Sequence, residues 1–120
     1  MSPSAKSVFY FGVYLVVLGI ALIVQPNLLL GLFNIVPTYE VWIRVVGMLL
    51  LALSVYYIVF SRNDVALFCK ITVIIRSTII LFFTAFTLLG WVQPAIILFS
   101  VIDLLGAIWT GVLLKKEGKW

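Results

Sequence analysis

Four long apolar segments, separated by short polar stretches, constrain the fold of this chain more than any other feature. They cover about residues 8–25, 41–60, 71–90 and 95–114 of the 120-residue sequence. A helix that crosses the hydrocarbon core of a membrane needs about 20 apolar residues, so each segment is long enough to span it. The sequence therefore predicts an all-α integral membrane protein, a four-helix bundle that runs up-down-up-down as a single transmembrane domain over residues 1–120.

The composition supports a membrane class and argues against a soluble one. Hydrophobic residues make up 65% of the chain and charged residues only 10%, whereas an ordinary globular domain carries about 25% charged residues. The net charge of +4 comes from basic residues at the ends of the apolar segments and not from one basic patch. We therefore expect membrane lipid as a partner and no nucleic acid.

Residues 27–36, between the first two segments, are apolar but too short to span a membrane. They are predicted to form a short interfacial helix on the outer side, before Pro37 interrupts the chain. Thr38 then offers an N-cap for the second span.

The distribution of basic residues predicts the orientation. With four spans, one side of the membrane receives all of the Lys and Arg residues outside the spans, and these are Lys6, Arg62, Lys70, Lys115, Lys116 and Lys119. Basic residues near the ends of spans favour the cytoplasmic side, so both termini are predicted to be cytoplasmic.

Several kinds of chemistry are excluded by residue type. Cys69 is the only cysteine and the chain has no histidine, so one chain can form neither a disulfide nor a Cys/His zinc site. No glycine-rich phosphate loop and no Ser/His/Asp set is present. We expect no cofactor, no metal and no catalytic residue, and the sequence leans away from an enzyme.

Three ionisable residues lie inside the predicted spans and form a predicted intramembrane polar cluster: Arg44, Arg76 and Asp103. Counted at 1.5 Å per residue, Arg44 lies roughly 5 Å from the outer surface, Asp103 roughly 13 Å and Arg76 roughly 20 Å. An ionised Asp at the centre of a bilayer costs roughly 2.5–3.5 kcal/mol, so such a residue usually faces the bundle interior and meets a partner. Either arginine is long enough to reach Asp103.

Glu40 and Arg44 form a predicted pair at the outer rim. They are four residues apart at the start of the second span, in the favourable orientation for a helical ion pair. This pair is also the better candidate for contacts with a lipid headgroup or a partner subunit.

Small residues at helical spacing predict how the helices pack. Small side chains allow the backbones of neighbouring helices in a membrane to approach closely. The predicted packing residues are Gly12, Gly19, Gly47, Ser100, Ala107 and Gly111.

The segments WIRVVGMLLLALSVYYIVF (42–60) and PAIILFSVIDLLGAIWT (94–110), with Arg76 between them, resemble small uncharacterised bacterial four-helix membrane proteins of the broad DoxX-like type. The resemblance covers the span layout of the whole chain. It implies a four-helix bundle in the bacterial inner (cytoplasmic) membrane, and it implies no particular reaction.

Two functions follow from these observations and stay open at this point. In the first, the protein has no catalytic site and acts by helix–helix association, as a homo-oligomer or as a small subunit of a membrane complex. In the second, it is a small proton-linked carrier or a binder of a polar small-molecule ligand that uses Asp103 and the arginines. A simple structural ion pair between Asp103 and an arginine favours the first function, and a cavity at Asp103 favours the second.

Overall fold

The computed structural model describes residues 1–35, 37 and 40–120. These residues form six helical elements: α1 (Pro3–Val24), α2 (Pro26–Leu32), α3 (Trp42–Arg62), α4 (Ala66–Leu88), the single-turn 3₁₀-helix η1 (Pro94–Ile96) and α5 (Ile97–Lys116). No β-strand occurs in the described ranges, which confirms the all-α prediction. The predicted N-cap Thr38 and residue 36 of the predicted interfacial segment lie outside the described residues.

Local signals explain where the first two helices begin and end. The side chain of Ser2 caps α1 by accepting a hydrogen bond from the backbone N–H of Ala5, and Pro3 occupies the first helical position. The helix α1 ends at Val24 because Gln25 precedes a proline, which disfavours a helical conformation there. Pro26 then begins the short helix α2.

Four helices are long and apolar enough to cross a membrane: α1, α3, α4, and η1 together with α5. About half of their large apolar side chains are exposed, which would be a strong liability in water. In lipid the same outward faces meet acyl chains of similar polarity.

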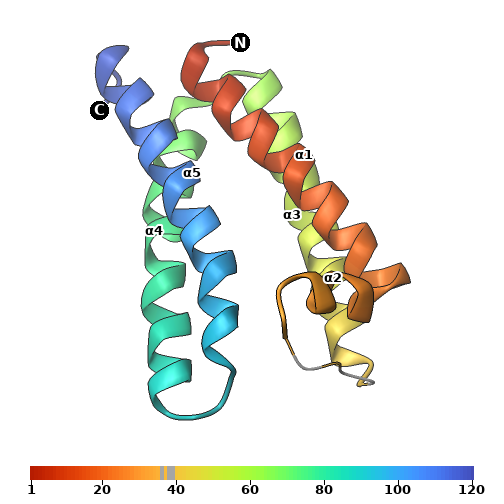
Figure 1. Ribbon diagram of the computed structural model, residues 1–120. Helices are drawn as coiled ribbons and strands as arrows, with labels where there is room; N and C mark the ends of the chain where they lie inside the picture. The colour runs from red at the N-terminus through yellow and green to blue at the C-terminus, as the bar shows by residue number, and fades with distance from the viewer. Residues whose placement is uncertain (36, 38–39) are drawn as a thin grey trace.

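The long helices form two pairs (Figure 1). Helix α1 packs along α3, and α4 packs along α5, while α1 also contacts α5. The two chain termini lie at the same end of the molecule, and toward the opposite end the pairs diverge, with α2 lying on the side of the α1–α3 pair that faces α5.

Glycines bring α1 and α3 into backbone contact. An added Cβ at Gly19 would lie 2.8 Å from the carbonyl oxygen of Gly47, and one at Gly47 would lie 2.7 Å from the carbonyl oxygen of Gly19. At Gly12 an added Cβ would lie 3.0 Å from Cβ of Tyr57. The α1–α3 pair therefore depends on residues without side chains at two levels along its length.

A group of polar residues closes the end that carries the termini. We call it the terminal latch, and it consists of Ser2, Ser4, Asp64, Glu117 and Lys119. The hydroxyl of Ser2 donates to Asp64 at 2.7 Å, and the hydroxyl and backbone N–H of Ser4 donate to Glu117 at 2.5 and 3.0 Å. Because α1 has no acidic residue in its own first turn, these carboxylates supply the negative charge that a helix N-terminus favours. Lys119 lies 3.8 Å from Asp64 and 3.7 Å from Glu117.

The latch predicts a loss of stability in acid. The hydrogen bond from Ser2 is the main reason why the pKa of Asp64 lies below its ordinary value of 3.8. Burial alone would raise the pKa of Glu117, but the bonds from Ser4 and the charge of Lys119 outweigh burial and hold it below 4.5. The folded state therefore releases these protons more readily than the unfolded state. The stabilisation is complete above about pH 5 and is lost as the pH falls through the folded pKa values.

We expect the latch to contribute no change in the melting temperature in neutral detergent from about pH 7 to pH 5.5 and to lower it below about pH 5. The double variant Asp64→Asn, Glu117→Gln should have a lower melting temperature at pH 7. Its melting temperature should also fall much less below pH 5 than that of the wild type. An equal fall in the double variant would show that other groups cause the acid sensitivity.

Candidate functional site

A crevice lies between the two helix pairs, and its lining is mostly apolar. Its cavity has a volume of about 180 Å³, similar in size to an engineered cavity of about 150 Å³ that binds benzene. Two lining residues carry polar groups, Asp103 from α5 and Tyr14 from α1. The apolar lining residues are Leu15, Leu18, Leu22, Leu30, Ile43, Val46, Leu50, Phe83, Ile96 and Phe99.

The helix directions place Asp103 and Tyr14 at the inner end of the crevice. Helix α5 runs from the diverging end toward the end that carries the termini. Asp103 therefore lies about 10 Å closer to the termini than Ile96 does. Helix α1 runs the opposite way, which puts Tyr14 about 12 Å further in than Leu22. A molecule in the crevice would therefore have apolar walls along its length and a carboxylate at one end.

Helix α2 contributes to the outer part of the crevice. Leu30 is only 4% exposed and lines the cavity. Phe33, which follows α2, packs its ring 4.6 Å from the ring of Phe99 on α5. The short segment predicted to lie at the membrane interface thus bridges the two helix pairs.

Asp103 is half-buried in this crevice. Among the described residues, no hydrogen bond reaches its carboxylate, and no ion pair includes it. A carboxylate in apolar surroundings needs a counter-charge or a proton. The described residues provide neither within direct contact of Asp103.

Arg76 is 2% exposed and is held by other groups. Its Nη2 donates to the hydroxyl of Thr110 at 2.9 Å and to that of Thr72 at 3.2 Å, and its Nε donates to the backbone carbonyl of Thr72. The guanidinium also lies over the rings of Phe11 and Tyr57, with its Cζ 4.7 and 5.9 Å from their centroids. Hydroxyls and aromatic faces thus take the place of a carboxylate around this cation.

One nitrogen of Arg76, Nη1, has no hydrogen-bond partner among the described residues. It lies 3.0 Å from the position that a Cβ would occupy at Gly106. Gly106 follows Asp103 by three residues, which is about 4.5 Å along the helix axis. The arginine and the aspartate are therefore close enough to interact through the electric field, without a direct bond.

The structure does not bring the three residues of the predicted polar cluster together. Arg76 lies against Thr72 and Thr110, whereas Asp103 faces the crevice. Arg44 is in the first turn of α3 and reaches the end of α1, where it donates to the backbone carbonyl of Ile23. The physical reason is that this carbonyl is one of the unpaired groups at a helix C-terminus, which attract a cation.

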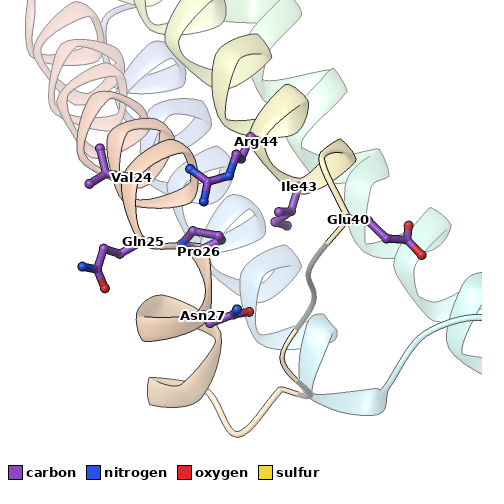
Figure 2. A pocket seen from close by; sticks show the side chains of 7 residues that line it. All are labelled: Val24, Gln25, Pro26, Asn27, Glu40, Ile43 and Arg44. Carbon is purple, nitrogen blue, oxygen red and sulfur yellow. The ribbon is translucent and has the colours of Figure 1, made fainter.

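A second, more polar hollow surrounds Arg44 at the diverging end. It has a volume of about 240 Å³, and we call it the rim hollow. Figure 2 shows the guanidinium of Arg44 beside Pro26, and the carboxylate of Glu40 directed away from it. The predicted pair thus shares this hollow while its two charged groups point in different directions. The lining residues are Val24, Gln25, Pro26, Asn27, Glu40, Ile43 and Arg44.

The predicted packing residues fall into two groups. Gly12, Gly19 and Gly47 lie at the α1–α3 contact, as described above. On α5, Ser100 and Ala107 are fully buried, while an added Cβ at Gly111 would make an ordinary 3.5 Å contact with Val73.

Sequence reasoning missed most of the groups that hold Arg76. Thr110 lies on the same face of its helix as Asp103, seven residues later, and this spacing indicates the shared face but not the contact of Thr110 with Arg76. Phe11, Tyr57 and Gly106 carry no such signal, because apolar and small residues occur on every face of these helices. No group of three or more potential metal ligands occurs in the described part of the chain.

Comparison of the chain with family models, with curated proteins and with solved structures found no match in any of the three.

Proposed function

We propose that this protein is an integral membrane protein that binds a small amphiphilic molecule in the crevice between its helix pairs. The ligand is an apolar molecule of about ten non-hydrogen atoms that carries one amine, and its ammonium group meets Asp103. The observation that carries this proposal is a carboxylate without a direct partner at the inner end of an apolar cavity of about 180 Å³. Apolar pockets with few, well-placed polar groups are the usual form of small-molecule sites.

The proposed setting is the bacterial cytoplasmic membrane, with both termini on the cytoplasmic side. The four long apolar helices support the membrane, and the basic residues at the terminal end support the orientation. The terminal latch would then lie at the cytoplasmic surface, and the crevice would open toward the outer half of the bilayer. The resemblance to the DoxX-like type stays a prediction.

The proposal is tested by titrating the detergent-solubilised protein with 4-phenylbutylamine and with 4-phenylbutanol, which differ only in their polar end. The wild-type protein should bind the amine about tenfold more tightly, because the ammonium both donates a hydrogen bond to the carboxylate and neutralises its charge, whereas the alcohol only donates a hydrogen bond. In Asp103→Asn this preference should vanish. In the control variant Asp64→Asn, which alters a carboxylate of the latch, it should persist.

Equal binding of the amine and the alcohol by the wild-type protein would contradict the proposal. An amine preference that survives in Asp103→Asn would also contradict it, because Asp103 would then not be the counter-charge of the ammonium group.

Helix–helix association, as a homo-oligomer or as a subunit of a complex, is the second candidate function. A shallow groove of about 290 Å³ on the α4–α5 pair favours it, since two predicted packing residues, Ala107 and Gly111, line this groove. Native mass spectrometry in mild detergent that finds only monomers, with no retained partner, would count against association.

A further inference from the structure

We propose that the rim hollow binds the phosphate of a phospholipid, with the guanidinium of Arg44 as its ligand and with one acyl chain lying in a neighbouring groove. This site is separate from Asp103, and it does not depend on the ligand proposed for the crevice. Three observations support it: the level of the hollow in the membrane, the chemistry of Arg44 and the groove that joins the hollow.

Two tryptophans indicate the level of the hollow. Trp42 and Trp91 lie at the diverging end of the molecule and are 68% and 70% exposed. Exposed tryptophans in membrane proteins gather at the level of the lipid headgroups. Arg44 follows Trp42 by two residues, which is a rise of only about 3 Å along α3. The rim hollow therefore lies where lipid phosphates lie.

Arg44 has the chemistry that a phosphate requires. Its bond to the carbonyl of Ile23 uses one nitrogen, Nη1, and fixes the guanidinium at the hollow. A guanidinium has five N–H donors in a planar fork, which suits two phosphate oxygens at once. Every other Lys and Arg of the chain lies in the half of the molecule that carries the two chain termini. Arg44 is therefore the cation that can meet a phosphate at the diverging end.

A long apolar groove adjoins the rim hollow. It favours a lipid, and not a free anion, as the ligand of the hollow. This outer groove runs along α1 and α2, has a volume of about 480 Å³, and shares Val24 and Gln25 with the hollow. On α1 it extends from Val24 back to Val17, which is about 10 Å toward the middle of the helix. An acyl chain whose phosphate lies at Arg44 would follow this direction into the membrane.

The experiment measures binding to the detergent-solubilised protein by native mass spectrometry and by the rise in melting temperature. The probes are dioleoylphosphatidylglycerol, dioleoylglycerol, which lacks the phosphate, and inorganic phosphate. The wild-type protein should retain one dioleoylphosphatidylglycerol and bind dioleoylglycerol about tenfold more weakly. Arg44→Gln should weaken phospholipid binding about tenfold, and the control Arg62→Gln, at the opposite end, should leave it unchanged.

Equal binding of the phospholipid by Arg44→Gln and wild type would overturn the proposal, as would equal binding of dioleoylglycerol and dioleoylphosphatidylglycerol. Inorganic phosphate that displaces the phospholipid at equal concentration would show an anion site and would overturn the lipid assignment. Should Arg44→Gln fail to fold, Arg44→Lys decides, since it keeps the charge and loses the planar fork. Severalfold weaker binding by that variant supports the proposal, and unchanged binding overturns it.

Discussion

Replacing Gly47 with alanine is expected to lower the free energy of unfolding by about 1–3 kcal/mol, the usual cost of overpacking a closely packed contact. The new Cβ would lie 2.7 Å from the carbonyl oxygen of Gly19, which belongs to the backbone and cannot rotate away. Helices α1 and α3 would have to separate. Gly19→Ala should have a similar effect, because its Cβ would lie 2.8 Å from the carbonyl oxygen of Gly47.

Gly31→Ala is the matched control for these variants. Gly31 also lies in a helix, but an added Cβ there has no atom within 4 Å. This variant should leave the stability unchanged or raise it slightly, since alanine favours helix over glycine by about 0.5–1 kcal/mol. Denaturation in detergent followed by circular dichroism measures all three variants. Equal stabilities of Gly47→Ala and Gly31→Ala would contradict the close contact of α1 and α3.

Replacing Arg76 with alanine is expected to cost about 2–4 kcal/mol, whereas Arg76→Met should stay within about 1 kcal/mol of the wild type. The alanine variant leaves a void between the rings of Phe11 and Tyr57 and removes the bond to Thr110. Methionine refills most of that void and removes a buried cation that has an unpaired Nη1. Thr110 also keeps its hydrogen bond with Ser7, at 2.7 Å, in both variants.

The comparison of the two Arg76 variants separates packing from charge. Unfolding of both variants at the same denaturant concentration as the wild type would show that the Arg76 side chain adds nothing to stability. A methionine variant as unstable as the alanine variant would show that the charge, and not the volume, stabilises this region.

The apolar segments of the sequence predicted the helical class well because each is long enough to decide it alone. The four long apolar helices overlap the four predicted segments, although α4 begins at Ala66, five residues before the predicted span over 71–90. The short segment after Gln25 is helical from Pro26 to Leu32. Helix ends were harder to predict. Capping by Ser2 extends α1 to Pro3, five residues before the apolar segment begins.

The contacts of the charged residues could not be predicted, for a physical reason. An amphipathic helix reveals from its sequence which face is buried, but these helices are apolar on nearly every side. The sequence therefore gave the depth of Arg76 and Asp103 without giving the rotation of their helices. The terminal latch is equally hidden, because its bonds join residues 62 and 113 positions apart.

The most direct test of the central claim is an experimental structure with bound 4-(4-bromophenyl)butylamine, in which the anomalous signal of bromine locates the ligand. We expect one bromine between the apolar walls of the crevice, and the ammonium nitrogen about 2.7–3.2 Å from the carboxylate of Asp103. A bromine outside the crevice would contradict the claim, and so would a carboxylate of Asp103 that forms a direct ion pair with Arg76.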